Sequence, residues 1–217
     1  MSHFAISTSK EPVRLFKSDF LEFFTHIHPA VIVVIWLPAV ILFMVLSALQ
    51  IKAAGTWLHL PAGFVIGLFI WTLAEYILHR FLFHYRPRNA RQERIFFLFH
   101  GVHHYQPKVK TRLVMPPVLS IPLAAVFYLF FWAVCSLIPG AQPWTGALFS
   151  GFLAGYLTYD LTHYSLHHVP FRGGYFKFLK RYHAQHHYRT PDARFGVSSP
   201  IWDKVFGTYP KTVDTEE

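Results

Sequence analysis

The chain is poor in charged residues and has almost no cysteine. Only 14% of its 217 residues are Asp, Glu, Lys or Arg, whereas 53% are hydrophobic; a soluble domain typically carries about 25% charged residues. The single cysteine, Cys135, can form no internal disulfide, and no Cys-x-x-Cys pair is available for zinc or an iron–sulfur cluster. A P-loop, a dinucleotide fingerprint and a Ser–His–Asp signature are also missing. The composition predicts an integral membrane protein.

Acidic residues are scarcer than basic ones, with 11 Asp and Glu against 20 Lys and Arg, so the net charge is +9. Together with the apolar stretches, this excess favours contact with a membrane surface and argues against nucleic acid as a partner. The first 28 residues are polar or mixed and show no cleavable signal peptide. We therefore expect an N-terminal segment, residues 1–28, followed by a membrane domain, residues 29–217.

Four long stretches have no charge or a single one. A helix needs roughly 20 apolar residues to cross the hydrocarbon layer, and residues 113–159 contain no charged side chain over a length that allows two crossings. Proline and glycine within residues 139–143 supply the turn between them. We predict an all-α fold whose spans cover residues 29–51, 57–78, 117–138 and 144–160.

Lys and Arg lie mainly in three segments outside these spans. There are three before residue 29, eight within residues 79–112 and eight after residue 160. Four spans place all three segments on one side, which the positive-inside rule makes cytoplasmic. Both termini and a helical cap are then cytoplasmic, at the endoplasmic reticulum if the protein is eukaryotic and at the inner membrane if it is bacterial.

Histidine is unusually abundant and clustered. Eleven of the 15 histidines fall into four short motifs, HRFLFH, HGVHH, HYSLHH and HAQHH, each just outside an apolar stretch. Histidine is the commonest metal ligand among side chains. These eleven are His79, His84, His100, His103, His104, His163, His167, His168, His183, His186 and His187. With the predicted topology, all four motifs reach one membrane face and can form one metal centre.

The spacing within three motifs suits a helix face. Residues at i, i+3 and i+4 are neighbours on a helix, so both HxxHH motifs are expected to point three imidazoles one way. His79 and His84 are five residues apart, about 140° around a regular helix. They should diverge unless the helix ends between them. Alternatively, the two serve different metals, or His84 comes from a turn just before Arg86 and Pro87. About ten imidazoles exceed the needs of one metal and suit two metals with five or six ligands each.

Two carboxylates stand one helical turn before a histidine motif. Glu75 precedes His79 by four residues, and Asp160 precedes His163 by three. A carboxylate that accepts the outer ring N–H of a ligand histidine fixes its tautomer and raises its basicity. We predict this orienting role for Glu75 and Asp160.

Other uses of clustered histidines fit this sequence less well. Haem ligation needs two axial histidines and leaves eight without a role, and metal carriers usually place polar ligands along a path within the membrane. Neutral imidazole suits iron, copper, zinc and nickel. Hydrolytic two-metal sites commonly include carboxylate ligands, which are few here. An all-nitrogen site next to lipid favours dioxygen-dependent oxidation of an apolar substrate.

At these residues the chain resembles the fatty acid hydroxylase superfamily of membrane di-iron enzymes, whose pattern is HxxxxH, HxxHH, HxxxH and HxxHH. The match looks nearest to the fatty acid 2-hydroxylases, through RLVMPP (residues 112–117), YDLTHYSLH (159–167) and FGVSSPIWDKVFGT (195–208). The resemblance covers about residues 60–210. The ligands it implies are His79, His84, His100, His103, His104, His163, His167, His183, His186 and His187. His168 lies outside the pattern.

The resemblance also implies the reaction and its partners. The expected activity is dioxygen-dependent hydroxylation of a lipid acyl chain, a fatty acid or sphingolipid, at two iron ions, for which zinc can substitute. Electrons would come from a separate donor of cytochrome b5 or ferredoxin type. A lipid desaturase, a sterol or carotenoid hydroxylase of the same superfamily, and a non-catalytic metal-binding membrane protein remain alternatives.

Overall fold

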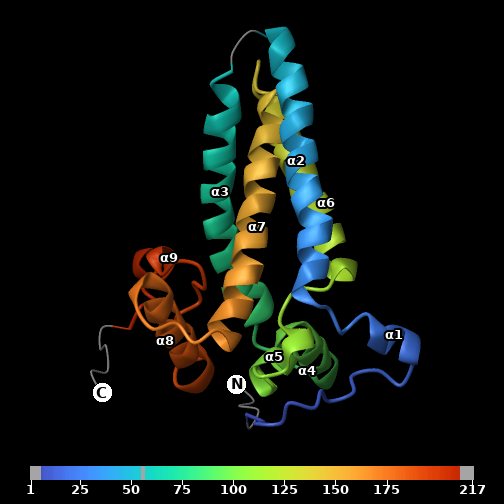
Figure 1. The fold of residues 1–217 in the computed structure, drawn as a ribbon, viewed down its shortest axis with the longest axis vertical. Helices are drawn as coiled ribbons and strands as arrows, with labels where there is room; N and C mark the ends of the chain where they lie inside the picture. The colour runs from blue at the N-terminus through green and yellow to red at the C-terminus, as the bar shows by residue number, and fades with distance from the viewer. Residues whose placement is uncertain (1–5, 55–56, 211–217) are drawn as a thin grey trace. The chain divides into compact units, whose positions relative to one another are not determined.

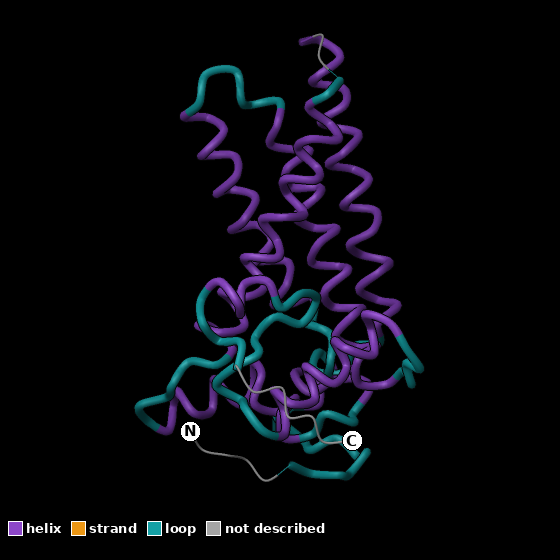
Figure 2. The backbone as a smooth tube through the Cα atoms, turned by 90° about the vertical axis from the view of Figure 1, so that its left-hand side faces the viewer, coloured by secondary structure: helices purple, strands orange, loops and turns teal. Residues whose placement is uncertain are grey.

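The computed structural model describes residues 6–54 and 57–210. Within these residues every regular element is a helix and no strand occurs (Figure 2), which confirms the all-α prediction. The longer helices are α2 (Pro29–Ala54), α3 (His59–Ile77), α6 (Pro117–Leu137), α7 (Trp144–His168) and α8 (Gly174–Tyr188). The shorter ones are α1 (Asp19–Phe23), α4 (Ala90–Phe96), α5 (Val102–Tyr105), α9 (Ile201–Val205), the π-helices η1 (Leu78–Phe83) and η2 (Phe97–Gly101), and the 3-10 turn η3 (Lys110–Arg112).

The chain divides into two compact units, which are described separately. The first, the long-helix unit, comprises Phe16–Trp71 and Val114–Leu161 and contains α2, α6, most of α3 and most of α7. These helices run alongside one another (Figure 1), and Phe43 of α2 meets Tyr128 of α6 and Phe149 of α7 with ring centroids 5.3 and 4.7 Å apart.

Three helical segments are long and apolar enough to cross a membrane, Pro29–Gln50, His59–Phe83 and Lys110–Leu137. These segments correspond to the first three predicted spans. Four of the six boundaries agree to within two residues, and the end of the second span and the start of the third differ by more. The fourth predicted span, residues 144–160, is helical as part of α7 but is not among the three. Small and polar residues lower its hydropathy, and many of its residues, including Ala147, Ser150 and Leu153, are fully buried between neighbours.

Glycine permits very close packing of α3 against α7. A Cβ atom on Gly67 would lie 1.9 Å from the carbonyl oxygen of Leu148, and one on Gly151 would lie 1.9 Å from that of Phe64. Neither space can hold a methyl group. The two glycines therefore set the distance between the helices at this crossing.

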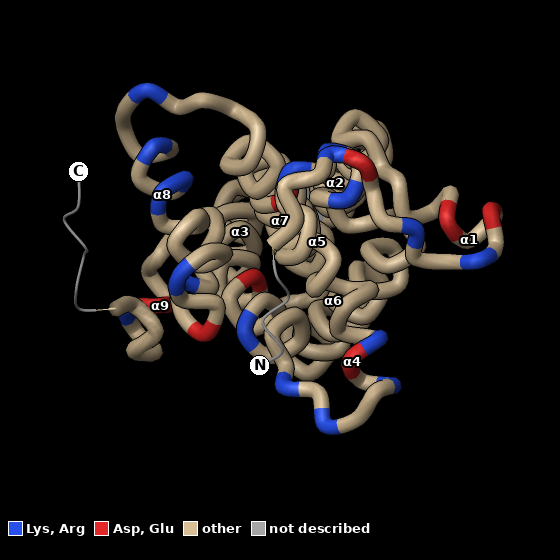
Figure 3. Tube along the Cα trace, turned by 90° about the horizontal axis from the view of Figure 1, so that it is seen from below, with Lys and Arg blue, Asp and Glu red and all other residues tan. Residues whose placement is uncertain are grey.

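The second unit, the histidine unit, comprises the described residues within 1–15, 72–113 and 162–217. Its α8 is amphipathic, with Leu179, Tyr182 and the histidines of the last motif buried and Lys177 and Arg181 exposed. Asn89 caps α4 by accepting from the amide of Gln92 at 3.0 Å. Figure 3 shows the Lys and Arg of this unit along α8 and around α4.

Candidate metal centre

Ten of the eleven clustered histidines form two groups of five in the histidine unit. Within each group, the nitrogen atoms available to a metal all lie within 4.8 Å of one another. The His79 group consists of His79, His84, His100, His104 and His186, and the His103 group consists of His103, His163, His167, His183 and His187. His168 belongs to neither group. The structure thus brings together the ten residues proposed as ligands.

A π-helix brings His79 and His84 to the same group. The chain leaves the α-helical pattern at Leu78, and the amide of His84 donates to the carbonyl of His79 at 3.0 Å, an i→i+5 bond. A five-residue spacing is one turn of a π-helix, so the rings lie on one side with centroids 4.9 Å apart. The helix also ends between the two residues, because Phe83 is the last residue of η1 and His84 is its C-cap. The predicted exception, a helix that ends between the two, therefore holds, and the widened last turn is the part that the sequence did not predict.

Each HxxHH motif is divided between the two groups. His100 and His104 belong to the His79 group, whereas His103 belongs to the His103 group. The last motif does the reverse, since His183 and His187 join the His103 group and His186 joins the His79 group. The expectation that each motif points three imidazoles one way is therefore wrong.

The inner atoms of the His103 group are the Nε2 nitrogens. Nε2 of His183 lies 3.0 Å from that of His163, 2.9 Å from that of His167 and 3.0 Å from that of His187. A fourth contact, between Nε2 of His187 and His103, is 3.0 Å. A ring nitrogen has one proton or one lone pair, so at most one of the three contacts at His183 is a hydrogen bond.

The His79 group has the same arrangement. Nε2 of His100 lies 3.2 Å from that of His79 and 3.0 Å from that of His104, and Nε2 of His186 lies 3.1 Å from that of His84. At a metal–nitrogen distance of about 2.1 Å, two ligands at right angles stand about 3.0 Å apart, and tetrahedral ligands about 3.4 Å. The observed spacings fit sites with five or six ligands, so the residues present suit two metal ions.

Burial keeps these rings in the form that binds metal. His103 and His187 are buried, and desolvation, followed by the neighbouring histidines, lowers the pKa of both well below the usual 6.5. The same causes lower the pKa of His84 and His100. Neutral imidazole is the metal-binding form, so both groups are available at neutral pH.

Two rings are oriented by backbone carbonyls. Nδ1 of His79 donates to the carbonyl oxygen of Phe195, and Nδ1 of His186 donates to that of Ala193 at 2.7 Å. Because a carbonyl only accepts, both rings carry their proton on Nδ1 and turn a bare Nε2 inward. Backbone acceptors have no signature in the sequence, so sequence reasoning missed them.

The two predicted orienting carboxylates have other hydrogen-bond partners. Glu75 accepts from the amides of Val197 and Ser198 at 2.7 and 2.8 Å and from the Ser198 hydroxyl. His79, the ring that Glu75 was expected to orient, instead uses the Phe195 carbonyl. Asp160, in the long-helix unit, accepts from the Met115 amide and the Tyr156 hydroxyl, both at 3.1 Å. Its predicted role toward a histidine stays a prediction.

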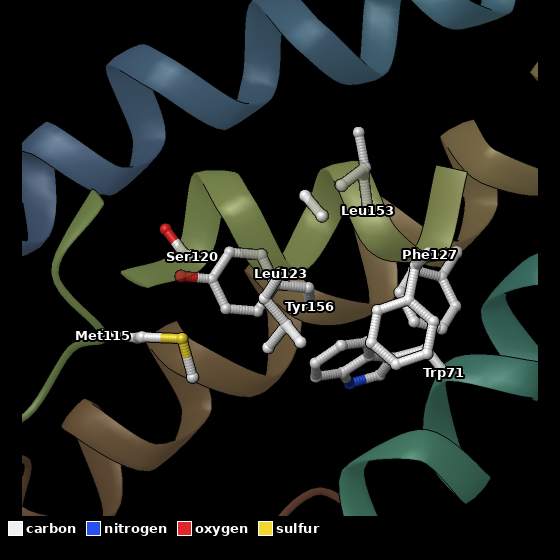
Figure 4. A pocket seen from close by; sticks show the side chains of 9 residues that line it. Trp71, Met115, Ser120, Leu123, Phe127, Leu153 and Tyr156 are labelled. Atoms are coloured by element: carbon white, nitrogen blue, oxygen red, sulfur yellow. The ribbon is translucent and has the colours of Figure 1, made fainter. Parts of the chain in front are cut away.

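The long-helix unit contains a small apolar cavity. Figure 4 shows Trp71 of α3, Phe127 of α6 and Tyr156 of α7 around it, with Met115 and Leu123 nearby. The remaining lining residues are Ser120, Ala124, Phe152 and Leu153. Aromatic and aliphatic walls of this kind suit a hydrocarbon chain.

Fold and site together define a helical membrane protein with paired five-histidine groups, and comparison with known proteins identifies it further. The family model for fatty acid hydroxylase matches residues 64–208, so the chain belongs to the fatty acid hydroxylase family. It is an oxidoreductase of the monooxygenase type.

Two curated relatives and one solved structure are similar to the chain. Dihydroceramide fatty acyl 2-hydroxylase FAH1 of Arabidopsis thaliana is 40% identical over 97% of this chain and 85% of its own length. Ceramide very long chain fatty acid hydroxylase SCS7 of Saccharomyces cerevisiae is 42% identical over 88% of this chain, which spans about half, 48%, of that relative. A solved structure described as full-length scs7p with only the hydroxylase domain visible has a TM-score of 0.79 and 42% identity, covering 88% of this chain and 70% of that one.

Proposed function

We propose that the protein adds a hydroxyl group to the α-carbon of the acyl chain of a ceramide-type lipid. The reaction consumes one dioxygen, two electrons and two protons, and yields the 2-hydroxyacyl lipid and one water. The observation that carries the proposal is the pair of five-histidine groups, because no other donor set in the described residues suits metal-dependent oxidation. The relatives, which are named as an acyl 2-hydroxylase and a ceramide fatty acid hydroxylase, support the choice of substrate.

The ten histidines would hold two iron ions, five to each ion. Iron bound by imidazole supplies the dioxygen-dependent oxidation chemistry. The protein contributes ligands that are neutral because they are buried, and two rings fixed by the carbonyls of Phe195 and Ala193. Burial of the histidine rings would also exclude bulk water from the site, which limits side reactions. Zinc binds the same donors, so a metal analysis must identify the element.

For the membrane arrangement we propose four spans, with α7 crossing as the fourth over residues 144–160. Residues 1–28 would form a cytoplasmic segment and residues 29–217 the membrane domain, with both termini and the metal centre on the cytoplasmic side. The fourth span is supported by the structure of residues 144–160, which are helical throughout. The cytoplasmic side is supported by the concentration of Lys and Arg in residues 79–112 and after residue 160.

The substrate and the electron donor would approach from different environments. A short segment of the acyl chain would contact the apolar cavity lined by Trp71, Phe127 and Tyr156. Electrons would come from a separate protein of cytochrome b5 or ferredoxin type. Exposed basic side chains of the histidine unit, such as Lys177 and Arg181 of α8, suit an acidic partner.

The test is lipid mass spectrometry of cells that express the chain with an electron-donor protein. We expect 2-hydroxyacyl lipids with the wild-type chain and none above background with His183→Ala, which removes the ring nitrogen nearest three other ligands. His168→Ala is the matched control, because His168 lies in the neighbouring motif but outside both groups. Unchanged products from His183→Ala, or none from the wild-type chain, would contradict the proposal.

A further inference from the structure

The loop between α8 and α9, residues 193–198, is held by two buried carboxylates. Asp203 of α9 accepts from the amides of residues 195 and 196, both at 2.8 Å. Glu75 of α3 accepts from the next two amides along the chain, at 2.7 and 2.8 Å. Two side chains, one from α3 and one from α9, thus accept hydrogen bonds from four consecutive backbone amides of the loop.

The carbonyls of the same loop bind histidine rings. Phe195 accepts from Nδ1 of His79, and Ala193 accepts from Nδ1 of His186, and both rings belong to the His79 group. The His103 group differs, because in the described part of the chain three of its rings have a buried Nδ1 without a hydrogen-bond partner. These are His103, His183 and His187, and in the His79 group the same is true of His84.

We infer that Asp203 and Glu75 are positioning residues for one metal of the two. By holding the 193–198 loop, they keep its carbonyls on His79 and His186, so the ion in the His79 group is bound more tightly than the ion in the His103 group. Outer acceptors of this kind commonly change metal affinity about 10- to 100-fold. The inference rests on the proposed two-metal centre and deepens it.

The contacts around Asp203 leave it no alternative position. Its side chain is fully buried, and beyond the two amides it accepts from the Thr208 hydroxyl at 2.7 Å. A Cβ atom on Gly196 would lie 2.1 Å from the Ser199 carbonyl oxygen and 2.8 Å from the Asp203 carboxylate. The loop backbone therefore lies directly against the carboxylate, and only glycine fits at the contact.

The experiment compares Asp203→Asn with Asp192→Asn. Asn keeps the volume of Asp203 but places an N–H group against an amide N–H. Asp192 is exposed and lies in the segment that leads into the loop, so its substitution removes the same charge without touching the loop's hydrogen bonds. The readout is the release of iron to a chelator from the purified, iron-loaded full chain, followed over time.

We expect two phases of release from the wild-type chain, and about a 10- to 100-fold acceleration of the slower phase with Asp203→Asn. The other phase, and both phases of Asp192→Asn, should match the wild type. In a His84→Ala background, which disables the His79 group, Asp203→Asn should change nothing further. In a His183→Ala background it should accelerate the remaining release.

Equal acceleration of both phases, or acceleration in the His84→Ala background, would overturn the inference, because either result means general loosening of the protein. Unchanged release would also overturn it. If circular dichroism shows that Asp203→Asn does not fold, Glu75→Gln replaces it, because Glu75 of α3 holds the same loop. The expected and contradicting results are the same. If the wild-type chain holds fewer than two metal ions, the proposed metal centre itself is refuted. Metal analysis of the purified protein detects this outcome independently of the release kinetics.

Discussion

Replacing Gly67 by alanine should destabilise the long-helix unit. The added methyl would stand 1.9 Å from the carbonyl oxygen of Leu148, a backbone atom that cannot rotate away. To reach an ordinary contact of 3.4 Å or more, α3 and α7 must separate locally by more than 1 Å. Overpacking of this severity costs about 3 kcal/mol, at the upper end of the usual range, and alanine returns about 1 kcal/mol of helix propensity. The net loss is about 2 kcal/mol.

A loss of about 2 kcal/mol corresponds to a fall in Tm of about 4–8 °C for a chain of this size. Thermal unfolding in detergent micelles, followed by tryptophan fluorescence, measures it. Gly63→Ala on the same helix is the matched comparison, since its methyl would meet the Cβ of Ala147 at 2.8 Å, a softer contact. Gly151→Ala should resemble Gly67→Ala, and the double variant should lose less than the sum, because one separation accommodates both methyls. Equal melting of the Gly63 and Gly67 variants, or full additivity, would refute the reasoning.

Three further predictions concern the buried polar groups. Removing the metal ions with a chelator should lower Tm, because ions that bind only the folded chain stabilise it by mass action; equal melting with and without chelator would contradict this. The metal-free protein should lose stability as pH falls below about 6.5, since burial lowers the pKa of His103 and His187 in the folded state, so the unfolded chain binds more protons. Urea midpoints at pH 7.5 and 5.5 measure this, and equal midpoints would refute it. Asp160→Asn should cost about 1 kcal/mol, because a neutral amide replaces the carboxylate that accepts from the Met115 amide and the Tyr156 hydroxyl; a Tm equal to that of exposed Asp192→Asn would contradict this.

The helical fold was predictable because membrane insertion leaves a simple pattern in the sequence. Three of the four apolar stretches meet the requirements of a span, and their bounds match the helices α2, α3 and α6 closely. The stretch at α7 is one whose composition does not identify it as a membrane span. A helix packed against its neighbours needs small residues such as Gly151 at close crossings, and those residues lower the hydropathy that a sequence reading depends on.

The histidines that come together were also predictable, but their division into two groups was not. Side-chain spacing identifies candidate ligands, whereas the π-helix at Leu78–Phe83 and the carbonyls of Phe195 and Ala193 are backbone features. No residue type is reserved for a widened helix turn or for an accepting carbonyl. Asp203, whose carboxylate holds the loop, stands 16 residues beyond the last histidine motif and had no signal of its own.

The geometry of HxxHH explains why the histidines divide into two groups. Its last two histidines are consecutive, and consecutive residues on an α-helix point about 100° apart, so they cannot face one ion. On α8 the first histidine of the motif, His183, lies between them in angle, about 40° from the residue at i+4 and 60° from the residue at i+3. His183 therefore pairs with the nearer ring, His187, and His186 reaches the other group. In the first motif, where His100 lies in the π-helix η2 and the other two in α5, His100 likewise joins His104 and His103 reaches the other group. The two motifs, with opposite assignments, give three histidines to each group, and the pairs His79–His84 and His163–His167 raise each group to five.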